Sequence, residues 1–408
     1  MGLTLYGKFE RLLLEVEVAP ERASGQLSAC RSTWMKLHFM CLLWGLGVMT
    51  FSAGCADAPG GGAPISERDR IVFVGDSITD GHTLPLLVQQ ALREAGRPVP
   101  VCVNAAVAGN TAKDMRARIE RDVLPRRPTL VTFNAGVNDA HHAVSLEDYS
   151  KDVTAIADRL KADGIPMLIL TTTTLGPRNA AMEERLCVYN NFLRGFARER
   201  GYVLAEVFAR MDEARKAGRE GTESDHVHLN FDGYRAMTRA VLDALGDADV
   251  PVPEKLEVSL MPGIIQQWKM RPAAKEPPLT EETVRALKPD ASWKDCTLPE
   301  TEPMPHWWPE QERKRGFAQS LAKAVGEGGR YIGVAAIESP KARQVYFNTG
   351  AQLETVWLNG KRIYKSERWT GWHPGKERVP AQLGVGVNTV VIESGPAFFL
   401  SVTETNDW

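Results

Sequence analysis

Short apolar runs alternate with segments of helical periodicity between residues 66 and 249. The runs predict strands buried on both faces, over Ile71–Gly75, Pro100–Asn104, Leu130–Asn134, Met167–Thr171 and Tyr202–Val207. Helical spacing is clearest in Leu146–Asp163 and in Gly233–Leu245, with Gly246 placed to end the second helix. Strands that alternate with helices are typical of a parallel sheet, so residues 66–249 are expected to form an α/β domain.

A second pattern begins near residue 250. Prolines come first and indicate a boundary and an irregular connection: Pro251, Pro253, Pro262, Pro272, Pro277, Pro278 and Pro289. Strand-like runs follow, over Tyr331–Glu338, Gln344–Asn348, Leu353–Leu358, Arg362–Tyr364, Val387–Glu393 and Ala397–Thr403. Asn359-Gly360 between two of them is a strong hairpin signal, because a type I′ turn needs positive φ at both positions. Residues 250–408 are therefore expected to form a linker and a β-sandwich.

Residues 1–65 are expected to be an N-terminal extension, a signal and a tether. Met35-Lys36 opens an apolar run to Phe51, and the small residues Ser52-Ala53-Gly54 lead into Cys55. A charged start, a short apolar core and small residues before a cleavage point are typical of a secretory signal peptide. The end of the run resembles a bacterial lipoprotein signal, which implies export to the cell envelope with a lipid on Cys55. Serine at 52 departs from the usual leucine, so plain cleavage to a periplasmic or extracellular protein, or an uncleaved anchor, stays open.

Composition adds little to this outline. The chain has 408 residues, which fits two folded domains, and its formal charge of −2 gives no reason to expect a nucleic-acid partner. Three of its six cysteines (Cys30, Cys41 and Cys55) lie in the N-terminal segment, which leaves Cys102, Cys187 and Cys296. This odd, scattered set indicates buried single thiols and not a disulfide framework. The composition predicts no particular oligomeric state.

Residues with catalytic chemistry follow the predicted strands. Ser77 comes directly after the first strand, and Asp225 and His228 stand three positions apart far downstream. A serine hydroxyl needs a base to take its proton; His228 can be that base, and Asp225 can hold its tautomer. Backbone N–H groups of Ser77 and Gly109 and the side-chain amide of Asn138 can donate to the oxyanion of the tetrahedral intermediate. This chemistry needs neither a cofactor nor a metal ion.

The spacing supports a single site. Gly109 lies 32 residues after Ser77, and Asn138 lies 29 residues after Gly109. A strand-helix-strand unit takes about 30 residues, so each of these residues falls at the end of a successive predicted strand. Ligands of open parallel sheets bind at the carboxyl ends of the strands, which is where these residues are expected to meet.

These segments resemble the four sequence blocks of the SGNH, or GDSL-type, hydrolases. The blocks are Gly75-Asp76-Ser77-Ile78-Thr79, Ala108-Gly109-Asn110, Gly136-Val137-Asn138-Asp139 and Asp225-His226-Val227-His228, and the resemblance covers about residues 66–249. It implies a flavodoxin-like three-layer α/β/α fold and a Ser77-His228-Asp225 site. It also implies an oxyanion hole made by Ser77, Gly109 and Asn138. Members cleave acyl esters of sugars, lipids and thioesters.

Other interpretations of the same residues stay open. Gly-Asp-Ser is a common turn tripeptide, and Gly136 and Asn138 can be ordinary loop residues. Asp225, His226 and His228 could bind a metal ion with help from His141 and His142, although no further cluster at ligand spacing is present. Asp139, His141 and His142 are expected in a solvated loop, and His226 is expected to face solvent.

The C-terminal region bears on the substrate. Val356–Lys361 and Gly386–Val391 resemble the galactose-binding-like jelly rolls that accompany bacterial carbohydrate enzymes. Tryptophans that could stack on sugars or pack in the core are Trp307, Trp308, Trp369 and Trp372. The sequence thus predicts an exported serine esterase that removes short acyl groups, above all acetyl, from an acylated carbohydrate. A lysophospholipase- or thioesterase-like lipid hydrolase and an inactive carbohydrate-binding protein are the alternatives. All four blocks precede residue 250, so small esters are expected to need only that part of the chain.

Overall fold

The computed structural model describes residues 65–302, 307–367, 371–372, 374–375 and 377–405. All of them belong to one compact unit. The expected signal peptide, the lipid anchor at Cys55 and the tether lie outside the described residues, as do Trp369 and the side chain of Trp307. Among the helices of the described ranges, none is long and apolar enough to cross a membrane.

The first part of this unit is built on a parallel sheet of β2-β1-β3-β4-β5. Its strands are β1 (Arg70–Val74), β2 (Val101–Asn104), β3 (Leu130–Phe133), β4 (Met167–Leu170) and β5 (Val203–Ala205). Each lies within one or two residues of a predicted strand. The order is the flavodoxin-like one, and it places the switch point between β1 and β3. The fold class expected from the sequence is therefore confirmed.

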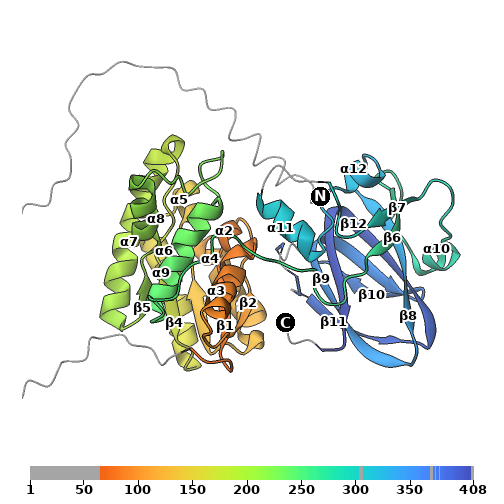
Figure 1. The fold of residues 1–408 in the computed structure, drawn as a ribbon, viewed down its shortest axis with the longest axis horizontal. Helices are drawn as coiled ribbons and strands as arrows, with labels where there is room; N and C mark the ends of the chain where they lie inside the picture. The colour runs from red at the N-terminus through yellow and green to blue at the C-terminus, as the bar shows by residue number, and fades with distance from the viewer. Residues whose placement is uncertain (1–64, 303–306, 368–370, 373, 376, 406–408) are drawn as a thin grey trace, which may run out of the picture. The chain divides into compact units, whose positions relative to one another are not determined.

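Helices cover both faces of this sheet (Figure 1). One layer packs α3 (Thr83–Glu94) and α8 (Val207–Lys216) against α9 (Phe231–Ala244), and the other packs α4 (Ala112–Arg118) and α7 (Ala180–Arg200) against α6 (Leu146–Ala162). Two short helices follow strand ends: α2 (Ser77–Asp80) and α5 (Val137–His141). Connecting turns of other helical types span Ile119–Val123, Leu124–Arg126 and Pro177–Asn179.

Local capping decides where these helices begin. Asn230 Oδ1 accepts a hydrogen bond from Gly233 N at 3.0 Å, so α9 begins at Phe231, two residues before the predicted start. Its buried face holds Tyr234, Met237 and Val241, which lie at helical spacing. Gly246 takes a φ of +89° just beyond the helix, where a left-handed residue stops further helical growth.

The second part is an antiparallel sheet with the strand path β10-β9-β12-β8-β6-β7, and β11 pairs with β9. Its strands are β6 (Gln267–Pro272), β7 (Lys294–Thr297), β8 (Tyr331–Ser339), β9 (Arg343–Leu358), β10 (Lys361–Lys365), β11 (Glu377–Leu383) and β12 (Gly386–Thr403). The helices α10 (Glu281–Ala286), α11 (Trp307–Arg315) and α12 (Leu321–Val325) lie between strands in sequence. This architecture is consistent with the β-sandwich expected after residue 250.

Two long strands replace four predicted short ones. β9 joins Gln344–Asn348 to Leu353–Leu358, and β12 joins Val387–Glu393 to Ala397–Thr403. Register shifts between Glu393 and Phe398 explain the interrupted alternation, because a bulge lets a strand bend and continue. The Asn359-Gly360 turn is confirmed, with φ of +50° and +78° before β10.

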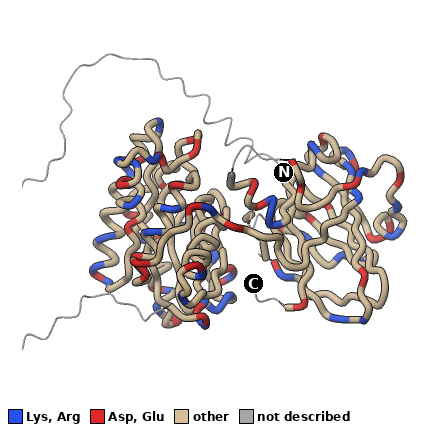
Figure 2. The backbone as a smooth tube through the Cα atoms, viewed as in Figure 1, with Lys and Arg blue, Asp and Glu red and all other residues tan. Residues whose placement is uncertain are grey.

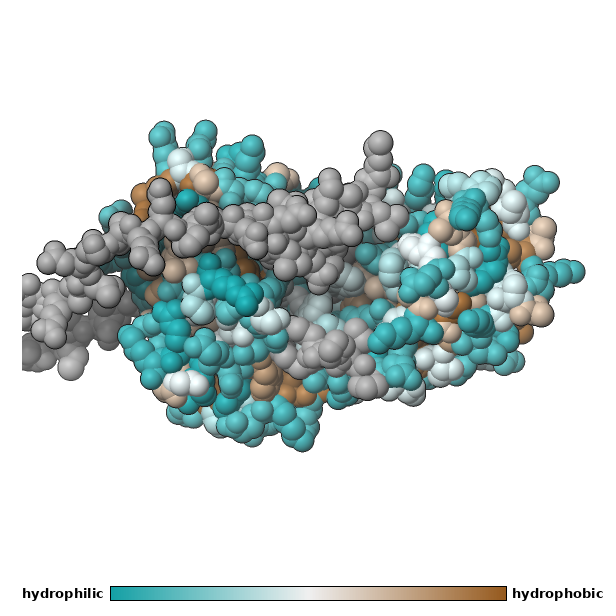
Figure 3. Space-filling model, turned by 90° about the horizontal axis from the view of Figure 1, so that it is seen from above, coloured by the Kyte–Doolittle hydropathy of each residue, from teal (hydrophilic) through white to brown (hydrophobic). Residues whose placement is uncertain are grey.

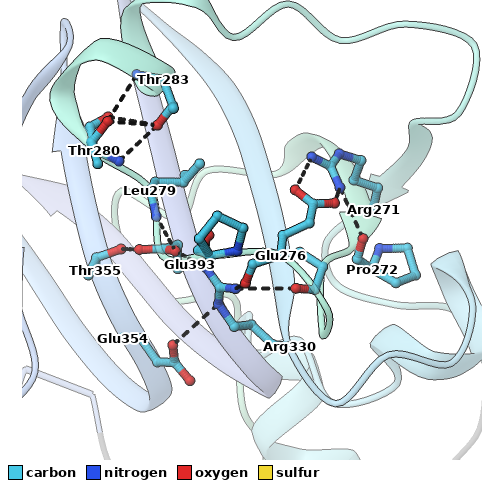
Figure 4. Close-up of polar contacts among 12 residues, drawn as sticks. Arg271, Pro272, Glu276, Leu279, Thr280, Thr283, Arg330, Glu354, Thr355 and Glu393 are labelled. Carbon is cyan, nitrogen blue, oxygen red and sulfur yellow. Dashed lines mark hydrogen bonds and ion pairs between the residues drawn. The ribbon is translucent and has the colours of Figure 1, made fainter.

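A buried ionic network fixes the proline-rich connection to this sheet (Figure 4). Glu393, 3% exposed, accepts hydrogen bonds from Arg330, from Thr355 Oγ1 at 2.7 Å and from Leu279 N at 3.0 Å. Arg330 also donates to the carbonyl of Glu276 at 2.8 Å. These hydrogen bonds satisfy the buried charges of Glu393 and Arg330. They therefore hold the segment from Ala273 to α10 against the sheet although it has little regular structure.

The surface shows no segregation of charge between the two parts. Lys and Arg are interspersed with Asp and Glu along both (Figure 2), and the face seen in Figure 3 is mainly hydrophilic with scattered apolar residues. Cys102, Cys187 and Cys296 are free thiols. Cys102 and Cys296 are buried as expected, whereas Cys187 is exposed because it lies on the outer side of α7.

Candidate active site

Ser77 opens the helix that follows the central strand β1. Asp76 caps this helix, since its Oδ1 accepts a hydrogen bond from Ile78 N at 3.0 Å. Tyr234 on α9 donates its hydroxyl to the carbonyl of Ile78 at 2.6 Å, which fixes α2 from the opposite side. The short α2 is thereby held at the carboxyl edge of the sheet with the Ser77 side chain half-buried.

The structure brings Ser77, His228 and Asp225 into one chain of hydrogen bonds. His228 Nε2 lies 2.9 Å from Ser77 Oγ, and His228 Nδ1 lies 2.6 Å from Asp225 Oδ2. Both distances are within hydrogen-bonding range for a nucleophile and its base, and for a base and the carboxylate that orients it. Residues 151 positions apart in sequence thus meet with the geometry of a serine hydrolase.

The Asp-x-x-His spacing has a local structural cause. Asp225 Oδ1 accepts hydrogen bonds from the backbone N–H groups of Val227 and His228, both at 2.9 Å. This turn leaves Oδ2 facing the ring of His228. His226 takes a φ of +62° within the turn and packs against Gly176, where an added Cβ would fall 2.1 Å from its Nδ1. His226 is therefore half-buried, so it is only partly exposed where the sequence led us to expect a side chain facing solvent.

Asp225 and His228 each favour the charged form of the other, the carboxylate and the imidazolium. Burial opposes the charge on Asp225, but hydrogen bonds from His228 and from two backbone N–H groups hold the pKa of Asp225 well below its usual range. Burial also disfavours the imidazolium, yet the hydrogen bond to Asp225 and its charge outweigh this and raise the pKa of His228. The imidazole is thus a stronger base than a free histidine, as proton removal from a serine requires.

The two further oxyanion candidates, Gly109 and Asn138, follow the neighbouring strands β2 and β3. Gly109 takes a φ of +83°, a backbone conformation that favours glycine, and no atom lies within 4 Å of an added Cβ, so the surroundings of its Cα are open. Asn138 is buried on α5, and its Nδ2 lies 3.1 Å from the carbonyl of Asn110 and 3.2 Å from Asp76 Oδ2. Its amide therefore bridges the first two sequence blocks.

Buried carboxylates beside the site were not anticipated. Asp139, expected in a solvated loop, is 1% exposed and accepts hydrogen bonds from Ala112 N at 3.1 and 3.2 Å. Burial raises the pKa of Asp139 to about 7 and that of Asp76 to about 6. His141 and His142 are exposed, as expected. The fourth residue of Gly-Val-Asn-Asp thus ties α5 to the start of α4.

Arg118 is a supporting residue that sequence reasoning missed. It is 4% exposed, and it donates to Asn110 Oδ1 at 2.6 Å, to the carbonyl of Gly75 at 3.2 Å and to that of Ala105. Burial lowers the pKa of Arg118 to about 10. Its guanidinium joins the loops that follow β1 and β2. Helical periodicity places Arg118 on α4 but gives no sign that its head group is buried.

The metal interpretation finds no support in this geometry. Both ring nitrogens of His228 already contact Ser77 and Asp225, and His226 turns toward Gly176. Across the described ranges, no group of three histidine, cysteine, aspartate or glutamate side chains is placed to hold a metal ion.

Comparison with known proteins identifies a family and two relatives. Residues 73–236 match the model of the GDSL-like lipase/acylhydrolase family. An acetylxylan esterase of Geobacillus stearothermophilus is 26% identical over 215 residues, which cover 45% of this chain and 96% of that protein. The esterase TesA of Pseudomonas aeruginosa is 25% identical over 155 residues, which cover 33% of this chain and 77% of that protein.

A solved structure is also similar over part of the chain. It is an α/β-hydrolase enzyme from the metagenome of Lake Arreo, with 25% identity, a TM-score of 0.42, and coverage of 45% of this chain and 98% of that one. The family match spans the elements that carry Ser77, Gly109, Asn138 and His228. The chain therefore contains an acylhydrolase domain of the GDSL, or SGNH, type, and its relatives support ester hydrolysis as the reaction.

Proposed function

We propose that the protein is a serine esterase that hydrolyses short acyl esters, above all acetyl esters, on carbohydrates. The observation that carries the proposal is the continuous hydrogen-bond chain from Ser77 Oγ through His228 to Asp225, at 2.9 and 2.6 Å. The carbohydrate is supported by the similarity to an acetylxylan esterase over nearly the whole of that protein. Export and a lipid on Cys55 belong to the same proposal and rest on the sequence alone.

The reaction follows from the positions of these groups. Ser77 Oγ adds to the acyl carbon while His228 Nε2 takes the hydroxyl proton, and Asp225 stabilises the imidazolium. The carbonyl oxygen becomes an oxyanion that accepts hydrogen bonds from Ser77 N, Gly109 N and Asn138 Nδ2. Collapse of the intermediate breaks the bond to the sugar oxygen, which takes the proton from His228 and leaves as an alcohol.

The second half of the reaction uses the same groups with water. Water adds to the acyl-Ser77 ester as His228 takes one of its protons, and the second tetrahedral intermediate expels the serine oxygen. His228 returns its proton to Ser77 Oγ, and the acid leaves. For an acetylated sugar the products are acetate and the free sugar hydroxyl, with the enzyme restored.

A substrate panel tests the proposal. Purified protein is assayed on acetylated xylo-oligosaccharides and on p-nitrophenyl esters of increasing acyl length, with Ser77→Ala as the control for enzyme-dependent hydrolysis. We expect release of acetate from the oligosaccharides, and p-nitrophenyl rates that fall as the acyl chain lengthens. Rates that rise with acyl length, with no release of acetate from sugars, would favour the lipid hydrolase. An absence of all ester hydrolysis by folded protein would favour the inactive binding protein.

A further inference from the structure

The last residue of α2 connects the catalytic loops with the C-terminal region, residues 250–405. Asp80 is 1% exposed, and its two carboxylate oxygens have different partners. Oδ1 accepts a hydrogen bond from Trp372 N at 2.8 Å, and Oδ2 accepts one from Ala108 N at 2.9 Å. Ala108 directly precedes Gly109, so one carboxylate holds both a residue of the C-terminal region and the turn of the proposed oxyanion hole.

The turn held by Asp80 is tightly defined. Asn110 N donates to the carbonyl of Val107 at 3.2 Å, and Gly109 has the positive φ that the third residue of a type II turn needs. Ala108 is the second residue of this turn, and its N–H group has its acceptor on Asp80. Asp80 therefore fixes the entry to the turn whose central peptide carries the Gly109 N–H.

A second contact lies one residue further along. Trp308 Nε1 on α11 donates to the carbonyl of Gly81 at 2.8 Å, and its ring meets that of Trp372 edge to face at 6.3 Å between centroids. An added Cβ at Gly81 would fall 1.8 Å from Trp308 Nε1. The φ of Gly81 is −61°, which any residue adopts, so the close indole is the feature that requires glycine here.

Both tryptophans are held in place by contacts within the C-terminal region. Further along α11, Arg315 donates to Glu312 at 2.8 Å, both side chains are almost wholly buried, and Met261 N donates to the carbonyl of Arg315 at 2.9 Å. Trp372 packs against the apolar cluster of Phe317, Ala351 and Phe399. The contacts with Asp80 and Gly81 are thus made by groups fixed to the C-terminal core.

We propose that the C-terminal region contributes to catalysis at the active site. Asp80 is the positioning residue: it binds Trp372 of the C-terminal region and, through Ala108, holds the Ala108–Gly109 turn in place. This inference rests on the proposed hydrolysis at Ser77. It departs from the expectation that small esters need only the residues before 250. A displacement of about 1 Å in a catalytic group can cost a factor of about 100 in rate, so loosening this turn should be visible in turnover.

Two variants test the connection from its two sides. Asp80→Asn keeps the size of the side chain but turns one acceptor into a donor, so either Ala108 N or Trp372 N loses its partner. Gly81→Ala leaves the backbone of α2 unstrained but drives Trp308 away. With p-nitrophenyl acetate we expect kcat to fall about 10- to 100-fold in both variants while KM changes less than about threefold, because the defect is in oxyanion stabilisation.

A pair of controls separates this from a general structural defect. Gly195→Ala, on α7 with no atom within 4 Å of the added Cβ, should keep wild-type kcat. Trp308→Ala should lower kcat as Gly81→Ala does, and the double variant should be no slower than Trp308→Ala, because the clash and the contact are then both absent. Inhibition by methylboronic acid, which forms a tetrahedral adduct on Ser77, should weaken by the same factor as kcat.

The inference is overturned if Gly81→Ala, folded as judged by its circular dichroism, keeps wild-type kcat, or if the loss falls on KM alone. It is equally overturned if the Gly81 and Trp308 effects simply add. The p-nitrophenyl acetate assay does not involve a sugar, so failure of the carbohydrate proposal leaves this test intact. Absence of wild-type hydrolysis would instead count against the esterase itself and would show on the substrate panel first.

Discussion

At the scale of single residues, the site depends on which of two nearby histidines faces the serine. His228 contacts Ser77 and Asp225, whereas His226 packs against Gly176. We expect His228→Ala to abolish turnover as fully as Ser77→Ala does, since nucleophile and base act as a unit. His226→Ala should change kcat less than about tenfold, because it removes only packing behind the turn. Measured kcat values for the three variants decide the matter, and the opposite ranking would assign the base to His226.

Because the pKa of His228 is raised, the activity should depend on pH in a defined way. The base must be neutral, so kcat/KM should be low at acid pH and rise through the pKa of His228, which lies above the ordinary value of about 6.5. Asp225→Asn removes the charge that raises this pKa, leaving burial to lower it. We therefore expect the acid limb to move to lower pH and kcat to fall by up to about 10⁴. An acid limb in the same place for both proteins would show that another group titrates.

The structural roles of Asp80, Asp139 and Arg118 could not be predicted from the sequence. The sequence blocks gave the positions of the reacting groups, because their types and spacing follow from the chemistry and from strand-helix-strand lengths. Nothing local shows that the Arg118 head group is buried between two loops, or that Asp80 faces Trp372, 292 residues away. Such roles depend on partners that only the tertiary fold supplies.

At the scale of elements, the parallel sheet was predictable because its strands are short apolar runs buried on both faces. The strands of the antiparallel sheet were less predictable. β6 alternates polar and apolar residues over Gln267–Arg271 but is short and ends in Pro272, whereas β11 does not alternate strictly and contains Pro380. β9 and β12 were each divided in two at their irregular positions, since a bulge interrupts the pattern without ending the strand.

The position of Asn138 depends on where helix α5 begins. It starts after Gly136, whose φ is +135° and whose added Cβ would fall 2.7 Å from Thr172 Cγ2, so the chain can deliver Asn138 close to the sheet edge only with glycine there. If the Asn138 amide binds the oxyanion, Asn138→Ala should lower kcat by about 10²–10³ with little change in KM. The same loss confined to KM would instead assign Asn138 to substrate positioning.

At the scale of the whole molecule, each part of the described chain has hydrophobic cores of its own, and the hydrogen bonds to Asp80 and Gly81 connect the two parts. One core is formed by residues between Ile71 and Leu256, and the others by residues between Ile265 and Leu400. The proposed catalytic groups all belong to the first part, yet Asp80 and Gly81 bind residues of the second. The region after residue 250 is thus placed to influence the reaction through α2, and Trp308 and Trp372 serve in packing in this structure. Sugar binding elsewhere in the sandwich is not required for that influence.

This arrangement predicts how the protein unfolds. Each part has hydrophobic cores of its own, so we expect two calorimetric transitions, because each core stays buried when the other part melts. The contact stabilises whichever part melts first, as any partner that binds only the folded state does. Gly81→Ala should therefore lower the first transition by several degrees, since about 1 kcal/mol shifts Tm by about 2–4 °C for a domain of 150–250 residues. The second transition should stay in place, and Gly195→Ala should move neither. A single transition that shifts as a whole in Gly81→Ala would mean that both cores form one cooperative unit, with the contact spread over far more of the chain than Asp80, Gly81 and the two tryptophans.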